Sequence, residues 1–197
     1  MRGIFIALWL LLPIGLVAFH HGPGKDLEKL DLAAVQLKLA DKLIAEEDFH
    51  GAVDAYDVAL GNLDPEDINS QRKIRLARAQ TRMLASELPV ANEELAGLIQ
   101  EMDDDPEADS KVAQEARASY ANSQYYMTWL MRLEGLPREV WEPEVDVARQ
   151  HYRLLSESAR DSGDVASQKR FSEDLESSIR LARMDLTELQ GLPLPSQ

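Results

Sequence analysis

"DFHGAVDAYDVAL", Asp48 to Leu60, is the stretch that indicates how this chain folds. Its apolar side chains recur at helical spacing, so Ala52, Tyr56 and Ala59 fall on one side of a helix. Small alanines let a neighbouring helix approach closely, and the tyrosine between them fills the remaining gap. The stretch therefore predicts a helix that packs against other helices.

Composition extends this interpretation to the whole chain. The protein has 197 residues, of which 45% are apolar, and this is enough for a real core. Alanine, leucine, glutamate and arginine are abundant, which favours an all-α fold. The net charge of -14 opposes binding to phosphate backbones, so we expect no nucleic-acid partner. The absence of cysteine excludes disulfides and thiolate chemistry.

The N-terminus carries an apolar run. Arg2 precedes uncharged residues 3–19, a length of about 26 Å as a helix against a bilayer core of about 30 Å. A cleavage site after Ala18 would need small residues around it, but Leu16 and Phe19 are large. A cleaved signal peptide and a buried helix are the alternatives, but we expect residues 1–19 to be a single-pass membrane anchor. Arg2 favours a cytoplasmic N-terminus, which places the rest of the chain in an extracytoplasmic position.

Beyond a linker at residues 20–25, the chain shows a helical pattern over residues 26–190, and residues 191–197 form a tail. Glycine, proline and aspartate clusters divide the pattern into seven helices. Five of the predicted helices lie near 25–47, 65–86, 89–102, 108–134 and 165–190, and the other two end near Leu60 and near Ser162. Pairs begin near Asp26, Pro65 and Ala108, an interval of about 40 residues that is typical of helical repeats.

Residues 33–65 resemble a tetratricopeptide repeat. The matching positions are Leu39-Ala40, Leu43, Phe49, Ala52, Tyr56, Ala59 and Asp64-Pro65. Gln36 stands where the motif has tryptophan, and the later pairs match less well. The resemblance implies about three antiparallel helix pairs around a concave groove that binds a protein or peptide, with a C-terminal capping helix. An ordinary antiparallel helical bundle is the alternative.

One apolar stripe marks the last predicted helix as that cap. Its members are Phe171, Leu175, Ile179, Ala182, Leu186 and Leu189. Charged residues cover the rest of the helix, and one apolar side with one polar side is what the end of an array requires.

Catalytic and metal-binding patterns are weak. His50 and His151 have no second histidine at helical spacing. The acidic run at residues 103–109 is similar to a calcium loop, but Ala108 and Gln114 replace the glycine and the closing glutamate. We expect no catalytic residue, cofactor or metal, and no enzyme activity.

Two features are candidates for partner binding. Arg72, Arg75, Arg78 and Arg82 recur at helical spacing and form a positive stripe, which would recognise carboxylates of a partner. Neutralisation within the chain, by Glu46, Glu47 or the acids at 103–105, is the alternative.

Tyr125 and Tyr126 form the second candidate. They lie in the most aromatic part of the chain, close to Trp129, and adjacent residues of a helix cannot point the same way. One of the two tyrosines is therefore expected at a partner surface, and the alternative is that the aromatic residues form core.

These observations predict a membrane-anchored helical scaffold that mediates protein–protein interaction, with the membrane contacted through residues 3–19. An exported ligand-binding or sensor module and an enzyme of unrecognised type are the alternatives. The oligomeric state is not readable from these patterns.

Overall fold

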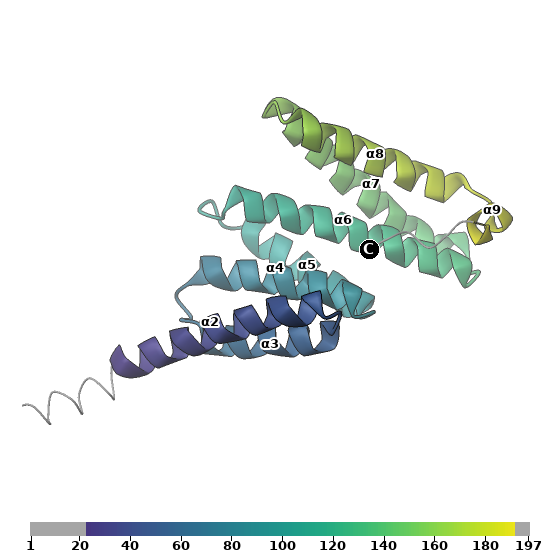
Figure 1. The fold of residues 1–197 in the computed structure, drawn as a ribbon. Helices are drawn as coiled ribbons and strands as arrows, with labels where there is room; N and C mark the ends of the chain where they lie inside the picture. The colour runs from purple at the N-terminus through teal and green to yellow at the C-terminus, as the bar shows by residue number, and fades with distance from the viewer. Residues whose placement is uncertain (1–22, 192–197) are drawn as a thin grey trace, which may run out of the picture. The chain divides into compact units, whose positions relative to one another are not determined.

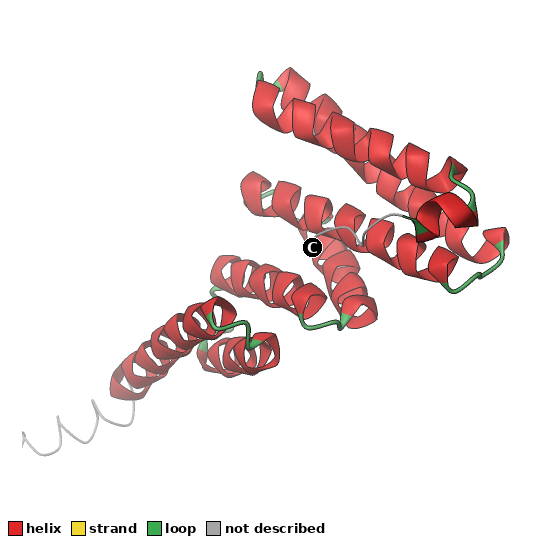
Figure 2. Cartoon of the chain, turned by 45° about the vertical axis from the view of Figure 1, so that its right-hand side comes forward, coloured by secondary structure: helices red, strands yellow, loops and turns green. Residues whose placement is uncertain are grey.

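The chain is helical throughout the part that the structure describes. The computed structural model describes residues 23–191, and within that range it contains helices and no strand (Figures 1 and 2). The helices are α2 Pro23–Ala45, α3 Phe49–Asn62, α4 Ile68–Leu84, α5 Leu88–Asp103, α6 Ser110–Leu133, α7 Arg138–Asp161, α8 Val165–Arg183 and α9 Leu186–Gln190. The predicted all-α class is confirmed.

Contacts divide the chain into two compact units, residues 1–71 and residues 72–197. In the described part of the first unit, α2 and α3 pack against each other. Ala40 of α2 and Ala52 and Ala59 of α3 are fully buried, and Tyr56 is buried with them. The small-and-large spacing of the 48–60 stretch therefore does mark the inner side of a helix.

In the second unit, helices that follow one another in the chain are packed together. α6 contacts both α5 and α7, and α7 contacts α8 (Figure 1). One apolar cluster centres on Leu95 and Leu98 of α5. A second gathers around Phe171 and Tyr152, between α7 and α8. Both clusters include residues of α6, so this helix lies in the middle of the unit.

Four turns close with the same pair of backbone hydrogen bonds. Each contains one residue in the left-handed region, namely Glu47, Ser86, Gly135 or Gly163. In every case its N–H donates to the carbonyl three positions earlier, and the next N–H donates to the carbonyl five positions earlier. This is the Schellman arrangement at a helix C-terminus. It joins α2 to α3, α4 to α5, α6 to α7 and α7 to α8, so a common turn underlies the helix pairs.

The start of α4 differs from its prediction. Asp64-Pro65 forms a separate turn in which the Asp64 carboxylate accepts the N–H of Glu66. The helix begins at Ile68, and the carboxylate of Asp67 accepts the N–H of Ser70 in its first turn. Asp64 and Asp67 are both suitable N-terminal caps, and the helix starts after Asp67.

The predicted last helix is two helices. α8 ends at Arg183 and α9 begins at Leu186. Asp185 and Glu188 form a reciprocal capping box at the start of α9. The carboxylate of Asp185 accepts a backbone N–H inside the new helix, and this breaks the continuous helix that the periodicity predicts.

The break also changes the apolar stripe. Phe171 and Leu189 are buried, whereas Leu186, in the same short helix as Leu189, is exposed. Ser178 and Leu181 are buried although neither belongs to the predicted stripe. The side of α8 that faces α7 is therefore rotated relative to the prediction.

The predicted anchor at residues 1–19 and all but the first residue of the tail at 191–197 lie outside the described residues. Among the residues that are described, no helix is both long and apolar enough to cross a bilayer.

Candidate functional site

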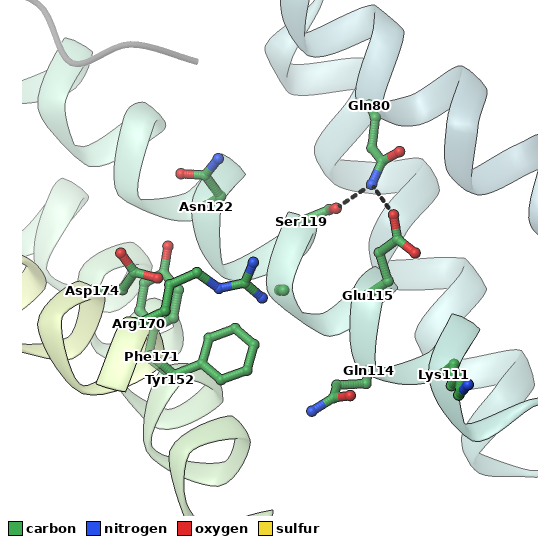
Figure 3. Close-up of a pocket in the computed structure, with 11 residues that line it drawn as sticks. Gln80, Lys111, Gln114, Glu115, Ser119, Asn122, Tyr152, Arg170, Phe171 and Asp174 are labelled. Atoms are coloured by element: carbon green, nitrogen blue, oxygen red, sulfur yellow. Dashed lines mark hydrogen bonds between the residues drawn. The ribbon is translucent and has the colours of Figure 1, made fainter. Parts of the chain in front are cut away.

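A polar groove lies along α6 in the unit formed by residues 72–197, and we call it the α6 groove (Figure 3). Its volume is about 750 Å³. Four helices contribute to its walls: α4, α6, α7 and α8. The lining residues are Gln80, Lys111, Gln114, Glu115, Ala118, Ser119, Asn122, Tyr152, Arg170, Phe171 and Asp174.

One face of α6 forms the floor. Lys111, Gln114, Ala118 and Asn122 follow one another at intervals of three and four residues, so they lie on one side of the helix. Asp109 fixes the start of this face, because its carboxylate accepts the N–H of Lys111 at 3.0 Å. The face extends for about 16 Å along the helix axis.

The wall on the α4 side has its polar groups paired. The side-chain amide of Gln80 donates to Glu115 at 3.1 Å and to the hydroxyl of Ser119 at 3.0 Å (Figure 3). These three side chains connect α4 to α6.

The opposite wall comes from α7 and α8. The Arg170 guanidinium lies 4.6 Å from the centre of the Phe171 ring and extends from α8 toward α6 (Figure 3). Burial raises the pKa of Asp174, an effect that Arg170 partly opposes. Burial also raises the pKa of the Tyr152 phenol, and the nearby Asp174 charge adds to this. This wall therefore offers a cation, a partly desolvated carboxylate and a phenol.

Several groups in the groove have no partner within the described chain. The side-chain amides of Gln114 and Asn122 make no hydrogen bond there, although both residues are partly buried. The carboxylate of Asp174 has neither an ion pair nor a hydrogen bond in the same residues. Each of the three keeps part of its surface exposed, so each can bond to a ligand that brings donors and acceptors.

The predicted arginine stripe lies elsewhere on α4. Its four members are paired with carboxylates of α5 and of the segments that flank it. Arg72 contacts Glu101 at 2.9 Å and Asp105 at 2.6 Å, and Arg75 contacts Glu101 at 2.5 Å. Arg78 contacts Glu94, and Arg82 contacts Glu87 at 2.7 Å and Glu94 at 3.4 Å. None of the four lines the α6 groove.

The pKa values reflect this pairing. The hydrogen bond that Arg72 donates to Asp105 raises the pKa of Arg72, whose side chain is 6% exposed. Burial alone would raise the pKa of Glu101, but hydrogen bonds from Arg75 and Arg72 lower it. The stripe is thus engaged in an ion-pair ladder between α4 and α5, and its role in partner binding stays a prediction.

Sequence reasoning named Asp105 as a neutralising group but missed the other acids. A signal was present, because Glu87, Glu94 and Glu101 recur every seven residues and so follow one face of a helix. An arginine repeat followed by a glutamate repeat in the next helix predicts that the two faces meet.

The two predicted tyrosines belong to different apolar clusters. Tyr126 is buried in the cluster around Leu95. Tyr125 is half-buried against the cluster formed by Trp129, Leu181 and Leu189. The rings of Tyr125 and Tyr126 meet edge to face at 5.8 Å. Both side chains therefore contribute to core packing, and only Tyr125 keeps part of its surface for a partner.

The histidine and the acidic loop have structural partners. His151 lies edge-on to Tyr120 at 5.2 Å, and burial together with Arg117 lowers its pKa. Asp103 pairs with Arg117, and Asp109 caps α6. In residues 23–191, no three histidine or carboxylate side chains gather as metal ligands would.

No family model matches this chain, and no curated protein shows significant similarity to it. The interpretation of the α6 groove therefore rests on its own geometry.

Proposed function

We propose that this protein is a helical-repeat scaffold that binds an extended segment of a partner protein in the α6 groove. The observation that carries the proposal is the groove itself, lined by Gln114 and Asn122, which make no hydrogen bond among the described residues, and by Asp174, whose burial the charge of Arg170 only partly offsets. The similarity of residues 33–65 to a tetratricopeptide repeat supports the same class of function.

The floor of the groove matches a peptide in length and chemistry. About 16 Å of α6 corresponds to roughly five residues of extended chain. A side-chain amide both donates and accepts, so Gln114 and Asn122 can each bond to a peptide carbonyl and a peptide N–H. Such contacts hold a backbone without regard to its side chains.

Asp174 adds a preference. The charge of Arg170 only partly offsets the burial of this carboxylate, so a second cation would stabilise it further, and we expect bound peptides to carry lysine or arginine near this position. The net charge of -14 attracts basic partners at longer range as well.

The location of the scaffold is part of the proposal. The apolar residues 3–19 would hold the chain in a membrane, with the helical part on the extracytoplasmic side. The partner would then be a protein of the same compartment or of the same membrane.

A display library of random twelve-residue peptides provides the test, with the full-length chain in mild detergent as bait. We expect enriched peptides to contain a basic residue and to bind Gln114→Ala/Asn122→Ala about tenfold more weakly, because two hydrogen-bonding side chains are removed. Gln150→Ala is the matched control, since Gln150 is an exposed glutamine of α7 outside the groove.

Peptides that bind the double variant as tightly as the native chain would refute the groove. Loss of binding in Arg75→Gln, with the double variant unaffected, would instead place the site on the arginine stripe.

A further inference from the structure

α2 exposes large apolar side chains on a face that α3 leaves uncovered. Ala33 and Ala40 are buried, whereas Leu32, Val35 and Leu39 are 42%, 59% and 38% exposed. These three are spaced by three and four residues, so they form one seam along the helix. We call it the α2 seam.

Charged side chains border the α2 seam, with acidic residues toward one end of the helix and lysines toward the other. Glu28 and Asp31 lie toward its N-terminal end, and Lys38 and Lys42 lie toward its C-terminal end. A rotation of about 100° per residue places all of them within about a third of the helix circumference, around the seam. All four are exposed. Only Lys42 has an ion pair among the described residues, a solvent-exposed one with Glu46 at 3.6 Å.

This pattern is self-complementary, and we propose that the α2 seam binds the α2 seam of a second copy in antiparallel orientation. A two-fold axis at Val35 brings Leu32 of each copy beside Leu39 of the other. It also sets Glu28 level with Lys42 and brings Asp31 within one residue of Lys38, about 1.5 Å along the helix. The same patch then serves both partners, as an isologous interface requires.

Other occupants fit the charges less well. A parallel pair would set Glu28 against Glu28 and Lys38 against Lys38, and like charges in register repel. A lipid surface requires an apolar centre with charges at the margin, whereas the rotation of about 100° per residue places Glu28 at an angle between those of Val35 and Leu39.

A contact between two single helices is small, and interfaces below about 1,200 Å² in total are weak and transient. Covalent trapping therefore suits the test better than a search for a stable dimer. The chain has no cysteine, so each engineered cysteine reports one position.

The first experiment uses the full chain in mild detergent under gentle oxidation. Val35→Cys lies at the proposed axis and should give a disulfide-linked dimer. Leu32→Cys mixed with Leu39→Cys should cross-link at least several-fold more than either alone. Val165→Cys is the control, because Val165 is 74% exposed on α8 and outside the seam; it should stay monomeric.

The second experiment reverses the charges in the Val35→Cys background. Glu28→Lys/Asp31→Lys and Lys38→Glu/Lys42→Glu should each reduce the yield of dimer several-fold, because each makes the seam uniform in charge. An equal mixture of the two should restore the yield, since one copy is then basic and the other acidic. Circular dichroism should not change, as all four positions are exposed.

Three results would overturn the proposal. One is cross-linking of Leu32→Cys to itself as readily as to Leu39→Cys, which indicates a parallel pair. Another is a mixture of the charge variants that fails to restore the dimer. The third is quenching of a dye on Val35→Cys by brominated lipid in vesicles without any disulfide dimer, which identifies a membrane as the occupant. None of these results bears on peptide binding in the α6 groove.

Discussion

Glu94 is the residue on which two arginines of α4 converge. Its side chain is 11% exposed, and it contacts both Arg78 and Arg82. A carboxylate this far from water depends on its partners, because its own hydration is largely lost. Arg78 and Arg82 of the ion-pair ladder should therefore stabilise the folded protein through Glu94.

Reversing the two arginines tests that role. Arg78→Glu/Arg82→Glu should lower the free energy of unfolding by about 3–5 kcal/mol, since it leaves a buried carboxylate beside two new like charges. Urea denaturation followed by circular dichroism measures the loss. Lys73→Glu is the control, because its pair with Asp109 is 3.7 Å long and its side chain is 58% exposed; there we expect a change within about 0.5 kcal/mol. An unchanged midpoint in the double variant would contradict the buried-pair interpretation.

The spacing of arginines predicts their common face but not what lies across from it. Arg78 is assigned to a stripe by periodicity alone, whereas its pairing with Glu94 depends on how α5 is rotated. The groove residues Gln114 and Asn122 could not be predicted for a related reason. Polar side chains along a helix indicate only exposure, and a groove needs a second helix, here α8, whose distance no local pattern sets.

At the scale of the element, the four equivalent turns differ in how well their residues suit them. Gly135 and Gly163 adopt φ of 74° and 77°, and Glu47 and Ser86 adopt 60° and 64° in the same role. A side chain in the left-handed region costs about 1–2 kcal/mol, and glycine avoids that cost. The first two helix pairs are thus closed by strained residues.

Substitutions that introduce glycine at these turns should raise the melting temperature, and substitutions that remove it should lower the melting temperature. Glu47→Gly and Ser86→Gly should raise the melting temperature, each by a stabilisation of up to about 1 kcal/mol, because glycine relieves the strain but loses more chain entropy on folding. Gly135→Ala and Gly163→Ala should lower it by about 1 kcal/mol each. Differential scanning calorimetry provides the comparison, and a loss of stability in either glycine variant would show that its native side chain makes a compensating contact.

Helix ends show how far the sequence determines the elements. The helix end at Gly163 is predicted from the sequence and found in the structure, because few other residues adopt the positive φ of this position. The spacing of the apolar residues around Asp185 is regular, and it predicts that Asp185 lies inside a continuous helix. Its capping box with Glu188 competes with that spacing, and the energies of a cap and of one helical turn are similar in size. The choice is therefore made by the packing of Leu189 in a cluster with Trp129 of α6, which is distant from it in sequence.

At the scale of the whole molecule, carboxylates dominate the response to pH. Hydrogen bonds from Arg72 and from the N–H of Glu107 lower the pKa of Asp105, and backbone N–H groups lower the pKa of Asp109. A carboxylate whose pKa is lowered in the folded state stabilises it above the unfolded pKa of about 3.9, and this is lost as the pH falls through the folded value. Asp174 has the opposite shift, so its ionised form costs stability at neutral pH.

Two isosteric substitutions should separate these effects. Asp105→Asn should be less stable than the native chain at pH 7, and the difference should vanish as the pH falls below about 3.9. Asp174→Asn should be more stable at pH 7, and its advantage should disappear as the pH falls through the raised pKa. Chemical denaturation at several pH values measures both. A destabilised Asp174→Asn at pH 7 would show that the carboxylate has a partner in the folded protein after all.

The contacts between helices that follow one another in the chain have a consequence for synthesis. α3 packs on α2, α6 on α5, α7 on α6 and α8 on α7, so each of these four helices has one packing partner that is synthesised before it. Proteins built from local contacts fold in microseconds to milliseconds, much faster than translation adds a helix. α3, α6, α7 and α8 can therefore each pack on an earlier helix as they emerge, and the nascent chain then exposes chiefly its newest apolar face while the remainder is still being made.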